Sequence, residues 1–283
     1  MKPLILLTND DGIHSPGLAA AADALHSLGD LIIVAPHEQQ TSMGRSRTQH
    51  GGRDGTITKT KVKYGNQVWD GFSVKATPAL AVEHAIYELA DREIALVVSG
   101  VNYGENVGSC VTVSGTIGAA LEAAEKGIPS LAISQEINST DYHSYSKEVN
   151  FSAASHFTGK IAEKVINGSL PFDADILKLE IPFGATPETR CVITRQDRLM
   201  YYTPIIQRGE ELFGSKGNIS HLPSKGKYSA EDTDAYALAQ GLVSITPLSY
   251  DLTSRISLEE LATNLGISLV ESQGNKYGNN SKI

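Results

Sequence analysis

Near the start of the chain stands the stretch Leu4-Ile5-Leu6-Leu7-Thr8-Asn9-Asp10-Asp11-Gly12. Its first part is a continuous apolar run, which predicts a parallel β-strand at residues 4–8 that is buried on both faces. Its polar end places two carboxylates directly after that strand. Because ligands of open parallel sheets bind beyond the carboxyl ends of the strands, the stretch predicts an α/β fold with a site at Asp10 and Asp11.

The chain continues from this stretch into a helix and a second strand. Ser15 is a suitable N-cap and Pro16 suits the first helical turn, so we expect a helix that runs to Leu28 and stops at Gly29. The apolar run at residues 31–35 predicts another buried strand. Two strands joined by one helix form a βαβ unit, whose strands pair in parallel.

The alternation of apolar runs and helical patterns continues to Pro182. It predicts strands at 95–99, 130–134 and 176–181, helices at 78–90, 115–126 and 151–166, and a hairpin or ribbon from the alternating segments 56–63 and 68–74. Beyond Pro182 it predicts extended arms and loops at 195–204 and 209–227, helices at 233–241 and 258–265, and a strand at 242–245.

These elements indicate a single α/β domain over residues 1–283, with a mostly parallel sheet flanked by helices. We place its core at about 1–182 and a β-rich C-terminal extension that embraces a partner subunit at about 183–265. The polar tail at about 274–283 is expected to be disordered.

The charge balance excludes some classes of protein. The chain has 283 residues, with 24 Lys and Arg against 32 Asp and Glu, which gives a formal net charge of −8. A protein that coats nucleic acid should be basic, so we expect no stable nucleic-acid complex. A small anionic substrate stays possible, because a metal ion or a helix N-terminus supplies local positive potential.

The sequence also predicts a cytoplasmic protein. No apolar run is long enough for a transmembrane helix, and the first apolar run ends in Asn9-Asp10-Asp11 instead of a signal-peptide cleavage site. Cys110 and Cys191 have no metal-ligand spacing, so we expect free thiols in a reducing compartment.

The adjacent carboxylates of Asp10 and Asp11 indicate a metal site. Two neighbouring anions repel each other, and a divalent cation would stabilise both in the charged form. Carboxylate oxygens suit Mg²⁺ or Mn²⁺. The simpler interpretation is a helix-capping Asp beside a solvated one.

Two further segments offer groups for the same edge of the sheet. The Gly-rich loop from Gly100 to Gly108 contains Asn102 and Asn106, which can ligate a metal through the amide oxygen or donate to a phosphate. Asn in such a loop can instead simply support a turn. Ser114-Gly115-Thr116 precedes a predicted helix, where unpaired N–H groups favour phosphate, although Ser114 or Thr116 can be a plain N-cap.

A hydroxyl-rich segment follows the second strand. Thr41 or Ser42 could complete a metal shell, and Arg45 or Arg47 could meet an anion. By itself this segment is weak support, because hydroxyl-rich loops are common.

Taken together, these residues resemble the SurE family. The resemblance rests on residues 6–13 with Ser15-Pro16-Gly17, on Val34-Ala35-Pro36, Ser99-Gly100-Val101-Asn102 and Ser114-Gly115-Thr116, and on the late segment from Thr233-Asp234 to Pro247-Leu248. It implies a Rossmann-like sheet, one divalent cation (Mg²⁺ or Mn²⁺) per subunit, and 5′- and 3′-nucleotidase activity on nucleoside monophosphates, with short polyphosphate as a substrate of some members. It also implies a homodimer or homotetramer with exchanged C-terminal elements.

The resemblance assigns roles to particular residues. It gives the metal ligands as Asp10, Asp11, Asn102 and a loop hydroxyl, which a count without gaps from Ala35-Pro36 places at Thr41, with Ser42 as the alternative. It gives the phosphate-binding residues as Asn106, Ser114, Gly115 and Thr116. Catalysis would involve Asp10 and Asp11, either through a metal-bound water or through direct attack by one carboxylate.

The sequence departs from the family pattern in two segments, and its loop at 36–48 is also unusual. Ala76-Thr77-Pro78-Ala79-Leu80-Ala81 stands where the family often has Gly-Thr-Pro-x-Asp-Cys, and Lys178-Leu179-Glu180-Ile181-Pro182 stands where Asn-Val-Asn before a proline is common. Both departures bear on the range of substrates more than on the chemistry.

Two other functions are compatible with an acidic pair after the first strand. A receiver-like phosphoacceptor domain would need an Asp after the third strand and a Lys near the fifth, where this chain has Ser99-Gly100 and Ser134-Gln135. A non-catalytic nucleotide-binding protein would bind nucleotide without turnover.

Overall fold

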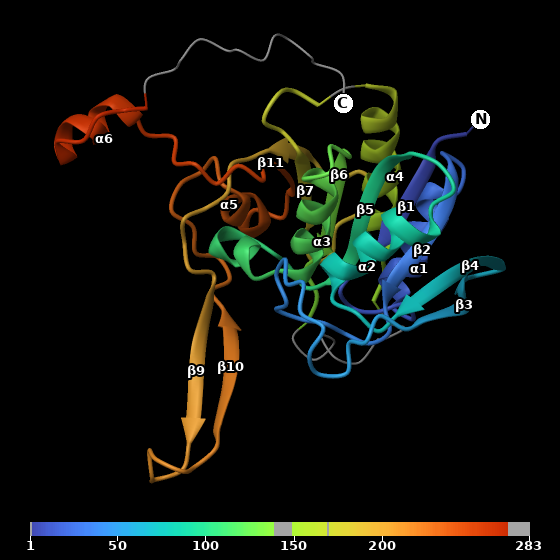
Figure 1. Ribbon diagram of the computed structural model, residues 1–283, viewed down its shortest axis with the longest axis horizontal. Helices are drawn as coiled ribbons and strands as arrows, with labels where there is room; N and C mark the ends of the chain where they lie inside the picture. Colours follow the sequence, from blue (N-terminus) through green and yellow to red (C-terminus); the bar gives the residue numbers. More distant parts are fainter. Residues whose placement is uncertain (1, 139–148, 169, 271–283) are drawn as a thin grey trace. The chain divides into compact units, whose positions relative to one another are not determined.

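A computed structural model describes residues 2–138, 149–168 and 170–270 of the chain. The chain divides into two compact units, Met1–Tyr250 and Asp251–Ile283. In the first unit, nine strands form one mixed sheet in the order β3-β4-β2-β1-β5-β6-β7-β11-β8 (Figure 1).

The strands of the sheet are β1 (Leu4–Thr8), β2 (Asp30–Pro36), β3 (Ile57–Tyr64), β4 (Gln67–Val74), β5 (Ile94–Tyr103), β6 (Ser130–Gln135), β7 (Ile176–Ile181), β8 (Cys191–Ile193) and β11 (Val243–Leu248). The α-helices are α1 (Pro16–Leu25), α2 (Pro78–His84), α3 (Gly115–Ala124), α4 (Ser152–Asn167), α5 (Asp234–Ala239) and α6 (Leu258–Leu265), with a short 3-10 helix at Gly108–Thr112 and a π-helix at Ala85–Leu89.

The central strands have the order of a Rossmann-like sheet. β4, β2, β1, β5, β6 and β7 all pair in parallel, so the parallel strands taken in chain order lie as 3-2-1-4-5-6. Only β3 against β4 and β11 against β7 are antiparallel within this sheet. The strand order reverses between β1 and β5, and the crevice at such a point is where ligands of doubly wound folds bind. The predicted fold class is therefore confirmed.

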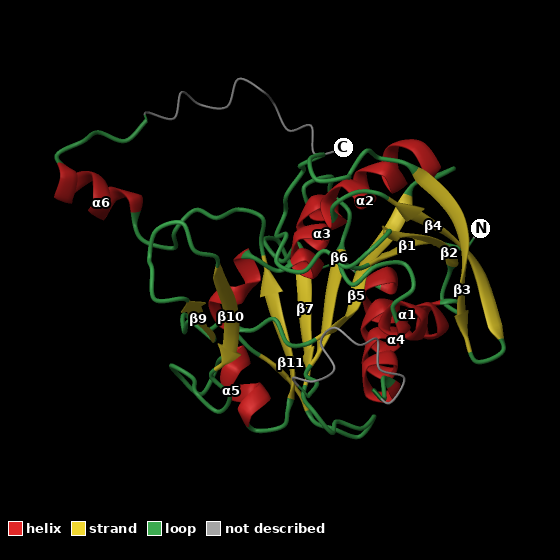
Figure 2. Cartoon of the chain, turned by 90° about the horizontal axis from the view of Figure 1, so that it is seen from below, coloured by secondary structure: helices red, strands yellow, loops and turns green. Residues whose placement is uncertain are grey.

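Helices cover both faces of the sheet (Figure 2). The core on one face joins side chains of α1 and α4 to the inner strands, including Leu18, Leu25 and Phe157. The core on the other face joins α2 and α3 to the same strands, including Val82 and Ala119. The strands between these layers read as continuous apolar runs because both of their faces are buried.

Two predicted elements differ from the structure. β5 continues to Tyr103, although its Gly and Asn residues predicted a loop from Gly100 onward. After a register shift it pairs again with β6, Asn102 opposite Ser134, and this long-range pairing overrides the local turn preference. The helix predicted at 78–90 is α2 followed by the π-helix.

The segment after β8 contains the predicted extended arm. It is an antiparallel hairpin of β9 (Tyr202–Arg208) and β10 (Gly217–Pro223), which forms a two-stranded sheet of its own (Figure 1). Its exposed apolar residues include Ile206, Ile219 and Leu222. The second unit contains α6, with Ser257 as its N-cap and Gly266 in the left-handed conformation that often ends a helix.

Several further expectations concern single features. Cys110 and Cys191 are both free thiols. Among the described residues, no helix has the length and apolar character needed to cross a membrane. The tail predicted to be disordered, about 274–283, lies outside the described residues.

Candidate active site

Asp10 and Asp11 lie at the carboxyl end of β1, beside the end of β5. A reciprocal turn holds them there, because the Asn9 side chain donates to Gly12 O at 3.0 Å and accepts from Gly12 N at 3.1 Å. Both aspartates are buried, with 5% and 2% of their surface exposed. The turn residues that ended the predicted strand thus position the predicted carboxylates at the strand-order reversal.

Asp10 contacts the N-terminus of α3. The Thr116 hydroxyl donates to Asp10 Oδ1 at 2.5 Å. A Cβ atom at Gly115 would lie 2.8 Å from Asp10 Oδ2, so only glycine lets the helix approach the carboxylate this closely. Ser114 caps the helix by accepting from Ile117 N at 3.2 Å. Gly115 and Thr116 therefore contact Asp10, and Ser114 caps the same helix, although the Thr116 hydroxyl is engaged by Asp10.

Asp11 is held from two sides. Tyr103 N donates to its Oδ2 at 3.0 Å, and Gln39 Nε2 donates to its Oδ1 at 3.1 Å. Burial, together with the charge of Asp10, raises the pKa of Asp11 to about 8. Burial also raises the pKa of Asp10 to about 6, against the opposing effect of the Thr116 hydrogen bond. Two carboxylates in this environment are stabilised as anions by a nearby cation.

The donor groups at this edge suit a hard divalent cation. The described residues contain no cluster of three or more His, Cys, Asp or Glu side chains that could hold a metal, so two carboxylates need neutral oxygens as further ligands. Asn102 is 9% exposed, and its amide nitrogen donates to Gly104 O at 2.7 Å. That bond orients the amide and leaves its oxygen as an acceptor, the kind of ligand that Mg²⁺ and Mn²⁺ take.

The segment after β2 lies along the acidic pair. Gln40 N donates to Asp10 O at 2.7 Å, and Gly44 N donates to Val113 O at 2.9 Å. Thr41 and Ser42 lie between these two anchors, and both are exposed. Ser42 has a positive φ of 63°, which is uncommon for a residue with a side chain. The predicted hydroxyl ligand therefore lies in a segment that borders Asp10, with Thr41 and Ser42 both as candidates.

Asn106 reaches the site through β6. Its side-chain amide donates to Ser134 Oγ at 3.0 Å, and Ser134 pairs with Asn102 across β5 and β6. The two predicted asparagines are thus close neighbours at the same sheet edge.

Arg45 and Arg47 both pair with glutamate side chains. Arg45 Nε donates to Glu122 Oε2 at 2.9 Å, and Arg47 Nη2 donates to Glu122 Oε1 at 2.7 Å. Both guanidinium groups also pair with Glu125. Both arginines are therefore engaged by carboxylates at the C-terminal end of α3, and the suggestion that they meet a substrate anion stays a prediction.

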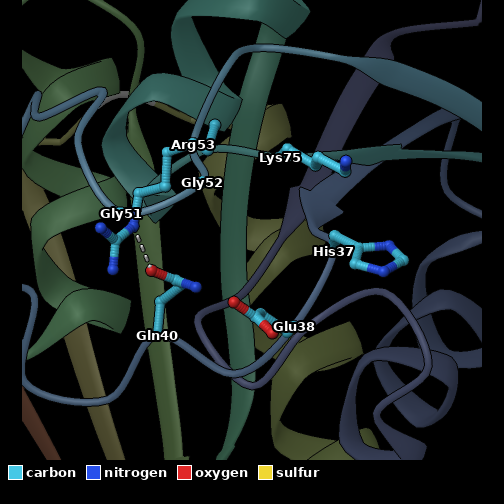
Figure 3. A pocket seen from close by; sticks show the side chains of 8 residues that line it. His37, Glu38, Gln40, Gly51, Gly52, Arg53 and Lys75 are labelled. Atoms are coloured by element: carbon cyan, nitrogen blue, oxygen red, sulfur yellow. Dashed lines mark hydrogen bonds between the residues drawn. The ribbon is translucent and has the colours of Figure 1, made fainter.

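A cavity of about 150 Å³ lies beside the segment that follows β2 (Figure 3). Its lining includes His37, Glu38, Gln40, Arg53 and Lys75. Arg53 Nε donates to Gln40 Oε1 at 2.8 Å, and Gln40 is the residue whose backbone contacts Asp10. Sequence reasoning missed Gln39, Arg53 and Lys75, since nothing in a polar loop indicates which side chains turn toward a strand end.

Comparison with known proteins identifies the family. The family model described as Survival protein SurE matches residues 5–203. The chain belongs to the SurE family. A protein of Thermococcus kodakarensis named 5'-nucleotidase SurE is 39% identical over 263 residues, which cover 91% of this chain and 96% of that protein. A protein of Moorella thermoacetica with the same name is 37% identical over 96% of this chain and 100% of that protein.

The solved structures agree with this assignment. The crystal structure of the SurE protein from Aquifex aeolicus matches with a TM-score of 0.72 and 29% identity, and it covers 93% of this chain and 100% of that chain. The resemblance drawn from the sequence motifs is confirmed.

Proposed function

We propose that this SurE protein removes phosphate from nucleoside 5′-monophosphates with the help of one divalent cation, Mg²⁺ or Mn²⁺, per subunit. The observation that carries the proposal is the buried pair Asp10 and Asp11 at the strand-order reversal, against the N-terminus of α3. The relatives named 5'-nucleotidase SurE support the same reaction. The chain is accordingly an enzyme, a phosphoric monoester hydrolase.

One group of residues in the site would hold the cation, and a second group would hold the phosphate. Asp10, Asp11, Asn102 and Thr41, or Ser42 in place of Thr41, would hold the cation. When bound, the cation supplies Lewis acidity and lowers the pKa of water for attack on phosphorus. Asn106, Ser114, Gly115 and Thr116 would hold the phosphate, because the first N–H groups of α3 are donors without helical acceptors.

The chain's own residues keep the carboxylates in place for this chemistry. Thr116 orients Asp10, and Gln39 with the Tyr103 backbone orients Asp11. The close packing of Gly115 on Asp10 brings the positive end of α3 to the reacting phosphate, where it neutralises developing charge. Catalysis then comes mainly from positioning and electrostatics, as in phosphoryl transfer generally.

The cavity beside Gln40 is the proposed position of the nucleoside. Its lining residue Gln40 donates from its backbone N to Asp10 O, and the cavity presents cationic and hydrogen-bonding side chains, including Arg53 and Lys75. Nucleoside 3′-monophosphates and short polyphosphate are the further substrates that we propose, since the same metal and phosphate groups would serve them.

We also propose a cytoplasmic homodimer or homotetramer. The exposed apolar residues of the β9–β10 hairpin support self-association, because contiguous exposed apolar surface is typical of interfaces. Light scattering of the full chain, compared with a variant that carries Ile206→Ser and Ile219→Ser, tests this. A monomeric wild-type protein would contradict it.

The reaction is tested by phosphate release from a panel of nucleoside 5′- and 3′-monophosphates and from short polyphosphate, with Mn²⁺, with Mg²⁺ and with EDTA. We expect release with either metal, none with EDTA, and none from Asp11→Ala. Nucleotide binding by the folded, metal-loaded protein without any release would overturn the proposal in favour of a non-catalytic binding protein.

A further inference from the structure

A fully buried ion cluster lies behind the Asn106 loop. Lys178 and Glu180 on β7 and Asp234 at the start of α5 are each 0% exposed. Lys178 Nζ lies 2.7 Å from Asp234 Oδ2 and 3.5 Å from Glu180 Oε1. Burying ionisable groups is costly, and burial raises the pKa of Glu180 to about 7 against the opposing charge of Lys178. Replacing such a cluster by apolar residues is often neutral or stabilising. Its presence therefore calls for a reason other than stability.

The third donor of the Lys178 ammonium points to that reason. An ammonium group has three N–H donors, and the third bonds to the backbone oxygen of Asn106 at 3.1 Å. On the other side, Asn106 N donates to Glu180 Oε2 at 2.9 Å. The cluster thus holds both peptide groups that flank the Cα atom of Asn106.

Asp234 bonds to a further backbone group of the same loop. Gly108 N donates to its Oδ2 at 3.1 Å, the oxygen that also receives the Lys178 ammonium. Burial lowers the pKa of Lys178, but the charges of Glu180 and Asp234 outweigh it and hold that pKa above its ordinary value, so the amine stays charged. The cluster is one connected unit with the backbone of residues 106–108.

We propose that Lys178, Glu180 and Asp234 are positioning residues that fix the Asn106 loop for binding the substrate phosphate. The inference rests on the proposed role of Asn106 and deepens it. With both flanking peptide groups fixed, the Asn106 side chain is directed to Ser134 at the edge beside Asn102. The segment from Lys178 to Pro182, one of two that depart from the family pattern, thereby acts on the phosphate site without touching substrate.

Glu180→Gln is the mildest test, because it keeps the shape of the side chain and removes its charge. We expect the KM for nucleotide and the inhibition constant of inorganic phosphate to rise about tenfold, as small misplacements of binding groups do. Mn²⁺ affinity should change less than about twofold, since the cluster holds the backbone of the Asn106 loop and none of the proposed metal ligands.

Lys178→Met, alone and combined with Glu180→Gln, tests whether the cluster acts as a unit. The single change leaves two buried carboxylates without their cation, and the double change removes one of them. We expect the double variant to bind phosphate no worse than Lys178→Met, since coupled residues are not additive.

Thr194→Val is the matched control. Thr194 belongs to a buried hydroxyl cluster with Ser244 and Thr246, at 2.7 and 2.8 Å, on the same side of the sheet. It should lower the melting temperature and leave phosphate binding unchanged.

Amide hydrogen exchange at Asn106 and Gly108 provides a readout that needs no turnover. We expect faster exchange in Glu180→Gln and no change in Thr194→Val. If Glu180→Gln lowers only the melting temperature, with phosphate inhibition and amide exchange unchanged, the positioning role is overturned. If the wild-type protein releases no phosphate, the proposed function fails, while the exchange data still decide whether the cluster fixes the loop.

Discussion

Buried carboxyl groups lie near both ends of α3, and their surroundings shift their pKa values in opposite directions. At the N-terminus of the helix, burial raises the pKa of Asp10 to about 6 and that of Asp11 to about 8. In the last turn of the helix the Glu122 side chain is also buried, but the hydrogen bonds and charges of Arg47 and Arg45 outweigh the effect of burial and lower its pKa.

The two sites differ in the source of the positive charge that can face their carboxylates. Arg45 and Arg47 neutralise Glu122 from within the chain, so that carboxylate is structural. Asp10 and Asp11 receive hydrogen bonds from neutral groups, among them Thr116 and Gln39. A buried carboxyl pair that receives hydrogen bonds from neutral donors is suited to bind a cation from solution, as the proposed metal-dependent reaction requires.

The largest effect is expected for Asp11→Asn. It removes a proposed metal ligand, so kcat for nucleotide should fall at least about a thousandfold. The melting temperature of the metal-free protein should stay equal or rise, because a carboxyl group whose pKa burial raises to about 8 costs folding free energy at pH 7, and Asn does not carry that cost. Phosphate release in the presence of metal measures kcat, and thermal unfolding in EDTA measures the melting temperature. Asp91→Asn, at an exposed position, is the control, and near-normal turnover of Asp11→Asn would refute the assignment.

Thr116→Val tests whether the threonine hydroxyl orients Asp10. The change keeps the side-chain volume and removes the hydroxyl that donates to Asp10 Oδ1. We expect kcat to fall about tenfold, as when a group that orients a metal ligand is lost. Thr158→Val, at another fully buried threonine on α4, should leave kcat unchanged. Equal rates for the two variants would show that the hydroxyl does not orient the carboxylate.

Arg53→Ala separates nucleoside binding from phosphate chemistry. If the cavity beside Gln40 holds the nucleoside, the KM for nucleotide should rise about fivefold while the kinetics with phenyl phosphate stay unchanged. Arg92→Ala, which removes a surface ion pair with Asp30, is the control. An equal loss with both substrates would place Arg53 at the phosphate instead.

Glu122→Gln should leave turnover unchanged and affect only stability. The loss of charge-assisted hydrogen bonds to Arg45 and Arg47 should lower the free energy of unfolding by about 2 kcal/mol at pH 7. Because the pKa of Glu122 is lowered in the folded state, its contribution is present above the ordinary value of 4.5 and is lost as pH falls through the folded-state pKa.

Urea unfolding of wild type and Glu122→Gln at pH 7 and at pH 3.5 measures this difference. The difference between the two proteins should be smaller at the lower pH than at the higher one. A difference that grows on acidification would mean that Glu122 is not held in the charged form by the arginines.

Local features of this protein could be predicted from its sequence. The run at residues 4–8 was readable as a buried strand because burial on both faces demands continuous apolar side chains. Asn9 and Gly12 marked the turn, and Ser114 marked the start of α3, because turn and cap chemistry depends on neighbours within a few residues. The metal and phosphate candidates followed from these strand and helix ends, and the family motifs supported the same residues.

The tertiary structure alone decided which of these local features meet. The order of strands brought β5 beside β1, and pairing with β6 extended β5 through Asn102 against its own turn preference. Long-range partners also turned Arg45 and Arg47 toward Glu122, and placed Lys178 and Asp234, which are 56 residues apart, against the Asn106 loop. Contacts between distant segments depend on the packing of the whole sheet, and no pattern within a short stretch of sequence encodes that packing.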